Sequence, residues 1–232
     1  MGVAAAGALA SCGADPPGKS AANPARAEPS TGGSRRAAGP RPDADDAWRR
    51  LVAGNERFAD GQATHPRQAA ARRRSLVGQQ RPIACVLGCV DSRVPPELVF
   101  DQGLGDLLIA RTAGQVLDEA VIGSAEYGVA HLGVPLVVVL GHANCGAVTA
   151  AVEAVRGDVA AVVQAIEPAV RATRVDDDPK VYLAACVAEQ ARRVATGLVE
   201  RSALISDAVE REQTTVVAAM YDLRSGRVRR LT

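Results

Sequence analysis

Short unbroken apolar runs alternate along the chain with longer segments in which apolar residues recur at helical spacing. The runs predict strands buried on both faces, and the third of them (LVVVL) is rich in β-branched residues. Four such strands are expected, at 83–89, 107–110, 136–140 and 214–221. A turn at 224–226 then leads into a last short strand at 228–231.

Helical spacing accounts for most of the remaining chain after residue 42. Asp43 and Asp46 are N-cap candidates for a first helix, on which Trp48, Leu51 and Phe58 can share a face. Five further helices are expected, at 120–132, 147–155, 160–172, 181–200 and 203–211. Buried strands that alternate with helices predict an α/β domain over residues 43–232, built on a mostly parallel sheet.

The first 42 residues have a different composition. Residues 15–42 are rich in Pro, Gly, Ala, Ser and Arg and contain no Leu, Ile, Val or aromatic residue. Such a segment cannot bury enough apolar surface to offset its ordering entropy, so residues 13–42 are expected to be a disordered linker.

Residues 1–12 resemble a bacterial lipoprotein signal in one respect and differ in another. An apolar run at 3–10 leads to Leu9-Ala10-Ser11-Cys12, which resembles a lipobox with Cys12 as the acylated residue. No Lys or Arg precedes Cys12, whereas signal peptides carry a basic first region. Two interpretations stay open: an extracytoplasmic lipoprotein anchored to a membrane at Cys12, and a cytoplasmic protein with a disordered leader.

The overall composition narrows the range of partners. A formal net charge of +1 gives no electrostatic reason to expect a nucleic acid partner. No apolar stretch reaches the length of a membrane-spanning helix. Apolar residues make up 47% of the chain and few are aromatic, so a core of Val, Leu, Ile and Ala is expected.

Two motifs with reactive side chains directly follow predicted strands. The first is 89–93 (CVDSR), and the second is 142–146 (HANCG). The carboxyl ends of parallel strands meet at one edge of a sheet, where ligands and catalytic groups collect, so Cys89, His142 and Cys145 are expected to lie close together. Two thiolates and one imidazole suit zinc, and three protein ligands leave a fourth position open for water or substrate.

The remaining His and Cys residues do not supply an evident fourth ligand. His65 lies in a polar stretch and His131 lies within a helical segment. Cys85 precedes Cys89 by four residues on one strand, a separation of about 13 Å, so it is expected in the core. An alternative interpretation keeps Cys145 as a helix N-terminal thiol and His142 as a loop residue without a metal.

Asp91 and Arg93 add a mechanism to this cluster. Asp91 can accept a hydrogen bond from water at the open zinc position, and Arg93 can hold Asp91 ionised through a bidentate contact. The alternative is a structural Asp–Arg pair that closes the loop. Their place beside a metal ligand favours the catalytic interpretation.

With these motifs, residues 43–232 resemble a β-class carbonic anhydrase. The strongest mark is Cys-x-Asp-x-Arg followed about 50 residues later by His-x-x-Cys. Further marks are 54–58 (GNERF), 103–106 (GLGD), 111–114 (RTAG) and 220–223 (MYDL).

The resemblance implies a role for each matching residue. Cys89, His142 and Cys145 would hold one Zn²⁺ per subunit, and Asp91 with Arg93 would form the catalytic dyad. Substrate-binding residues would be Gln80, which stands where the family has a Gln that hydrogen-bonds substrate, Tyr127 as a pocket aromatic, and Leu108 where many members have Phe.

The family reaction is the reversible hydration of carbon dioxide to bicarbonate and a proton. The resemblance also implies four parallel strands with an added edge strand, an N-terminal helical arm that packs on the partner subunit, a homodimer or larger homo-oligomer, and no organic cofactor.

Three other functions remain compatible with these residues. The same site could hydrolyse carbon disulfide or carbonyl sulfide, or it could be a non-catalytic zinc-binding module. The third is a redox function through Cys89 and Cys145, which could pair as a disulfide in an exported protein when zinc is absent.

Overall fold

The computed structural model describes residues 41–232, which form one α/β unit. The expectations for the lipobox-like segment with Cys12, and for the linker up to residue 40, lie outside the described residues. Within residues 41–232, no helix is both long and apolar enough to span a lipid bilayer.

One five-stranded sheet organises the unit, and its strands follow the order β2-β1-β3-β4-β5. The first four strands are parallel and β5 is antiparallel to β4, which confirms the expected parallel sheet with an added edge strand. The strand bounds are β1 (Ala84–Cys89), β2 (Leu107–Thr112), β3 (Leu136–His142), β4 (Thr215–Tyr221) and β5 (Val228–Arg230). β2 and β3 each run two residues beyond their predicted ends, so His142 is itself the last residue of a strand.

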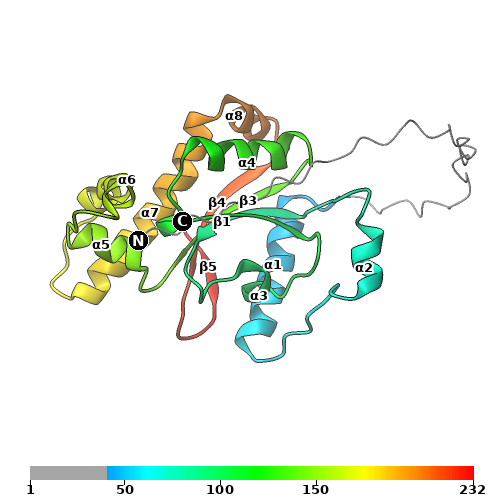
Figure 1. Ribbon diagram of the computed structural model, residues 1–232, viewed down its shortest axis with the longest axis horizontal. Coiled ribbons are helices and arrows are strands. Elements are labelled where there is room, and N and C mark those ends of the chain that lie inside the picture. The colour runs from blue at the N-terminus through cyan, green and yellow to red at the C-terminus, as the bar shows by residue number, and fades with distance from the viewer. Residues whose placement is uncertain (1–40) are drawn as a thin grey trace, which may run out of the picture. The chain divides into compact units, whose positions relative to one another are not determined.

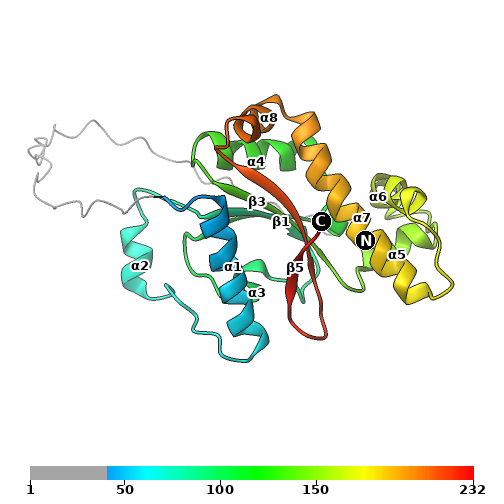
Figure 2. The same ribbon diagram turned by 180° about the vertical axis from the view of Figure 1, so that it is seen from behind.

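Side chains that alternate along the strands build a separate core on each face of the sheet. Val86 and Val138 contribute to a core with α1 (Ala44–Ala59) and α3 (Pro96–Val99). Leu87 and Val139 contribute to the larger core on the other face, together with residues of the later helices. Figures 1 and 2 show α1 and α3 on one side of the sheet and α4, α7 and α8 on the other.

All six predicted helices are present, and the first has its expected cap. Asp43 caps α1 by accepting a hydrogen bond from the backbone N–H of Asp46 at 2.7 Å. The later helices are α4 (Glu119–Ala130), α5 (Gly146–Val152), α6 (Ala160–Ala172), α7 (Pro179–Arg201) and α8 (Ala203–Glu210).

Three short elements were not predicted. These are α2 (Ala70–Ser75), α3 and the 3₁₀ turn η1 (Ala113–Gln115). Each is too short to show apolar periodicity, and α2 has no buried residue at all.

Candidate metal centre

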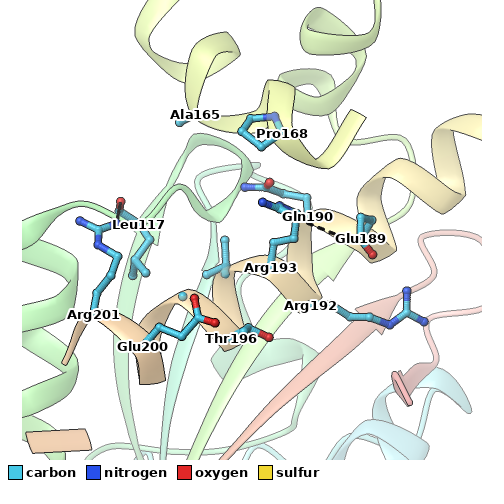
Figure 3. Close-up of a pocket in the computed structure, with 12 residues that line it drawn as sticks. Leu117, Ala165, Pro168, Glu189, Gln190, Arg192, Arg193, Thr196, Glu200 and Arg201 are labelled. Atoms are coloured by element: carbon cyan, nitrogen blue, oxygen red, sulfur yellow. Dashed lines mark hydrogen bonds and ion pairs between the residues drawn. The ribbon is translucent and has the colours of Figure 1, made fainter. Parts of the chain in front are cut away.

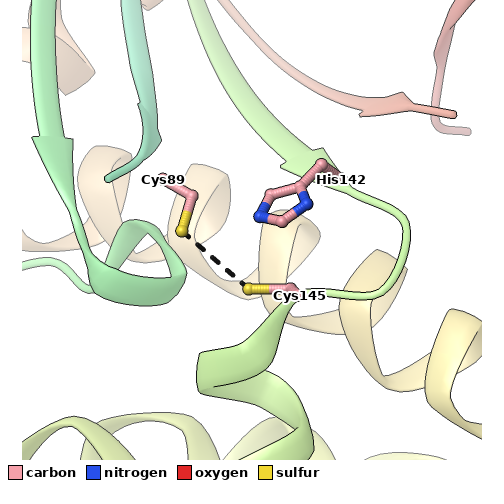
Figure 4. Close-up of side chains that lie close together, drawn as sticks. All are labelled: Cys89, His142 and Cys145. Carbon is pink, nitrogen blue, oxygen red and sulfur yellow. Dashed lines mark hydrogen bonds between the residues drawn. The ribbon is translucent and has the colours of Figure 1, made fainter. Parts of the chain in front are cut away.

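Cys89, His142 and Cys145 meet at the carboxyl edge of the sheet. Cys89 ends β1, His142 ends the neighbouring strand β3, and Cys145 is the N-cap residue of α5. All three are buried, and their donor atoms lie within 4.8 Å of one another (Figure 4). The two sulfur atoms are 3.9 Å apart. Within residues 41–232, no other group of three or more His, Cys, Asp or Glu side chains lies close enough to share an ion.

A tight turn after β3 brings Cys145 back beside His142. Asn144 adopts a left-handed backbone conformation with φ of 54°, which Asn tolerates better than most residues. The N–H of Ala143 donates to the carbonyl of Tyr221 on β4 at 2.9 Å, which fixes the start of the turn.

The ring of His142 presents one nitrogen to the two sulfur atoms. Its Nδ1 donates to the carbonyl of Ala143 at 3.0 Å, and its Nε2 is buried without a hydrogen-bond partner. A buried polar atom without a partner is costly, so Nε2 needs one. A metal-ligating His typically donates its other ring N–H to a nearby acceptor, as Nδ1 does here. His142 therefore fits the role of a metal ligand through Nε2.

Cys89 and Cys145 share a hydrogen bond, and their charges favour a cation at this place. A hydrogen bond from Cys145, assisted by the Gly114 N–H at 3.3 Å, lowers the pKa of Cys89 to about 4 although burial opposes the shift. The Cys89 thiolate, together with burial, raises the pKa of Cys145. A second negative charge 3.9 Å from the first is unfavourable without a counter-ion. A divalent ion removes that penalty, and two sulfurs with one imidazole are a zinc ligand set.

Asp91 lies beside this cluster and is held by Arg93. Arg93 donates to Asp91 from Nε to Oδ1 at 2.9 Å and from Nη2 to Oδ2 at 2.7 Å. These bonds hold the pKa of Asp91 well below its usual range. Oδ2 lies 3.8 Å from Nε2 of His142, so the ionised carboxylate faces the ligand atoms.

Arg111 supports the same loop, and no role for it was predicted. Its Nε donates to the carbonyl of Cys89 at 2.7 Å and its Nη2 to the carbonyl of Asp91 at 2.6 Å. Arg111 belongs to the family mark 111–114, but the sequence does not indicate which groups its side chain contacts. Arg111 fixes the backbone that carries both a ligand and the acid.

The predicted substrate residues do not join this cluster within one chain. Gln80 is exposed, in the coil before β1. Leu108 and Tyr127 line a cavity of about 360 Å³ that includes Cys85 but none of the three ligand residues. Tyr127 is 48% exposed and lies against His131, with ring centroids 5.3 Å apart and ring planes tilted by 33°.

The remaining cysteines in the described part of the chain are core residues. Cys85 and Cys186 are free and fully buried. Burial raises the pKa of Cys85 to about 12, so this thiol stays protonated. Its place in the core is the one expected from the sequence.

Comparison with known proteins identifies several relatives. A family model described as "Carbonic anhydrase" matches residues 84–228. The chain is 42% identical to carbonic anhydrase 2 of Mycobacterium tuberculosis strain H37Rv over 193 residues, which cover 78% of this chain and 89% of that protein. It is also 42% identical to a carbonic anhydrase of Mycolicibacterium smegmatis over 194 residues, which cover 78% and 90%.

Solved structures share the fold. A tetrameric β-carbonic anhydrase of the fungus Sordaria macrospora superposes with a TM-score of 0.64 and 22% identity, covering 79% of this chain and 96% of that one. The Coccomyxa β-carbonic anhydrase in complex with acetazolamide gives 0.64 and 24%, covering 78% and 84%.

Proposed function

The chain belongs to the β-class carbonic anhydrases, and from that premise we infer which of its residues carry out zinc-dependent reversible hydration of carbon dioxide. Cys89, His142 and Cys145 hold the zinc ion. The observation that carries this assignment is the convergence of their three donor atoms within 4.8 Å, beside an ionised carboxylate.

A zinc ion at this site would act as a Lewis acid and lower the pKa of a water molecule bound to it toward neutrality. Two thiolates offset the charge of that ion, so the protein needs a further group to orient the water. Asp91 supplies it as an acceptor that faces the ligand atoms. Arg93 keeps the acceptor ionised and fixes its direction with two hydrogen bonds.

We infer that the predicted substrate residues reach each metal centre from a second copy of the chain. Within residues 41–232, β2 is an edge strand with an unpaired side, and all six of its residues are half-buried although it begins with the apolar run LLIA. Antiparallel pairing of two β2 strands about a two-fold axis sets the start of one strand beside the end of the other. Leu108 stands near the start of β2, and Thr112 at its end pairs with the ligand Cys89.

Such a homodimer brings the cavity of Leu108 and Tyr127 from one copy toward the metal centre of the other. We propose that this apolar wall, with Gln80 as a hydrogen-bond donor, receives carbon dioxide and bicarbonate. A Tyr127→Ala variant that remains dimeric should raise KM more than it lowers kcat. A monomeric wild-type protein with full activity would contradict the arrangement.

The N-terminal segment bears on where this reaction takes place. Acylation of Cys12 would attach the enzyme to a membrane through a linker that ends near residue 42. Mass spectrometry of the mature N-terminus from the native host separates the two interpretations: a lipid-modified Cys12 as first residue supports the anchor, and an unmodified upstream segment excludes it.

Metal analysis combined with a stopped-flow hydration assay tests the function. The purified protein should carry one zinc ion per chain and hydrate carbon dioxide well above the buffer rate. Zinc-loaded protein at the buffer rate would instead identify a non-catalytic module. Faster turnover of carbonyl sulfide or carbon disulfide than of carbon dioxide would identify a hydrolase.

A further inference from the structure

Gly114 lies between a metal ligand and two helices of the larger core. It forms the middle of η1 with φ of 63°, a left-handed conformation that favours glycine. Its N–H donates to Sγ of Cys89 at 3.3 Å. A Cβ at this position would lie 2.6 Å from Cδ1 of Ile166 on α6 and 3.2 Å from Cβ of Ala147 on α5. The close packing leaves Gly114 little room on that side.

The carbonyl of Gly114 is bound by a side chain from a distant helix. Gln190 on α7 donates from Nε2 to this oxygen at 3.3 Å. Gln190 is 3% exposed, so its amide cannot exchange this partner freely with bulk water. One short chain of contacts therefore runs from α7 through Gly114 to Cys89.

Gln190 is also part of the wall of a cavity of about 600 Å³. Figure 3 shows it between Ala165 and Pro168 of α6 on one side and Arg193 of α7 on the other. Because Gln190 lines this cavity, packing does not enclose its side chain on every side, and its hydrogen bond to Gly114 helps to fix it. The hydrogen bond from Gln190 also restrains the backbone of Gly114, which has no side chain to restrict it.

We propose that Gln190 is a positioning residue for the metal centre, whose hydrogen bond to the Gly114 carbonyl keeps the Gly114 N–H directed at Cys89 Sγ. The inference rests on the proposed function, in which Cys89 ligates zinc. A donor to a ligating sulfur withdraws electron density from it, so the sulfur donates less to the metal and the metal remains a stronger Lewis acid. Loss of Gln190 weakens that effect without removing any ligand.

Substitution of Gln190 by Met tests this arrangement, since Met has similar size and no donor. The probe is Co²⁺ in place of zinc, because thiolate-to-cobalt absorption reports on the sulfur directly. In Gln190→Met we expect this band to move to lower energy. The zinc form should lose up to about tenfold in hydration rate at neutral pH, the low end of the range for altered partners of metal ligands. The pH profile of kcat should shift to higher pH.

A matched control is Gln164→Met on the exposed face of α6, which should leave band, rate and profile unchanged. If Gln190→Met folds poorly by circular dichroism, Gln190→Leu replaces it with the same expectation. A folded variant with an unchanged cobalt band and pH profile would overturn the role of Gln190. Wild-type protein that binds Co²⁺ without any thiolate band would instead contradict the metal centre itself.

Discussion

Arg93 binds both carboxylate oxygens of Asp91, with donor distances of 2.9 Å to Oδ1 and 2.7 Å to Oδ2. The backbone N–H of Arg93 adds a third bond to Oδ1 at 2.9 Å. Three donors on one carboxylate fix its direction, so Asp91 could turn to ligate a metal only by breaking contacts with Arg93. The described conformation is therefore one in which Asp91 is available as an acceptor.

Replacement of Asp91 by Asn should separate metal binding from turnover. The side chain keeps its shape but loses its charge, while all three ligands stay. We expect full zinc content by elemental analysis and a fall in carbon dioxide hydration of about 100-fold or more, the usual scale for a lost acid–base group. Asp60→Asn, which alters a remote Asp–Arg pair, is the control and should keep full activity. Equal activity in both variants would remove Asp91 from the mechanism.

Substitution of Cys145 by Ser should abolish both metal and activity. A hydroxyl is a poor zinc ligand beside one thiolate and one imidazole, so the site loses a charge and a soft donor. Cys186→Ser provides a comparison, because Cys186 is equally buried but lies outside the ligand cluster. The control should retain one zinc per chain even if its stability falls. Tightly bound zinc in Cys145→Ser would show that the ligand assignment is wrong.

Asp101 should make stability depend on pH. Its side chain is buried, and although burial opposes ionisation, bonds from Thr64, Arg57 and His65 lower its pKa to about 2. Since that value lies below the unfolded value of about 3.9, the charged form stabilises the fold above pH ~4. The contribution is lost as pH falls from about 4 to about 2.

Asn at position 101 isolates this effect, because it tolerates the left-handed φ of 44° found there. Asp101→Asn should lower the free energy of unfolding at pH 7 by about 2 kcal/mol. Chemical denaturation at several pH values should show the gap to wild type closing below pH ~3. A gap that stays constant with pH would mean that charge is not the cause.

Gln115 offers a test of what surrounds η1. Its side chain is 2% exposed, and neither Oε1 nor Nε2 has a hydrogen-bond partner within the described chain. An unsatisfied buried amide costs about 1–3 kcal/mol, so Gln115→Met should be neutral or stabilising by thermal unfolding. A loss of more than about 1 kcal/mol would instead indicate that water or another subunit satisfies the amide.

Much of the sheet and the metal centre follows from local sequence pattern. Buried strands appear as unbroken apolar runs, and Asp43 marks the start of α1 as its side chain predicts. Cys89, His142 and Cys145 could be grouped because they lie at, or within three residues of, the carboxyl ends of two strands that the α/β pattern predicts to be parallel. Each of these features is marked by a local pattern around its own residues, so the sequence predicts it even where the grouped residues are far apart in the chain.

The parts that escaped prediction depend on contacts between distant residues. Gln190 lies 76 positions from Gly114 in sequence, and neither local segment indicates that the two residues form a hydrogen bond. Asp101 is surrounded by donors from 36 to 44 residues away. The family marks 103–106 and 111–114 pointed to these regions, but the sequence carries no signal for which backbone group each side chain would meet.

The adjacency of β1 and β3 gives the metal a second consequence, as a cross-link between distant parts of the chain. Cys89 and Cys145 are 56 residues apart in sequence, yet one ion can join them. Any ligand that binds the native state alone stabilises it by linkage, by about 4 kcal/mol when its free concentration is a thousandfold above Kd. Chelators should therefore lower the melting temperature as well as the rate.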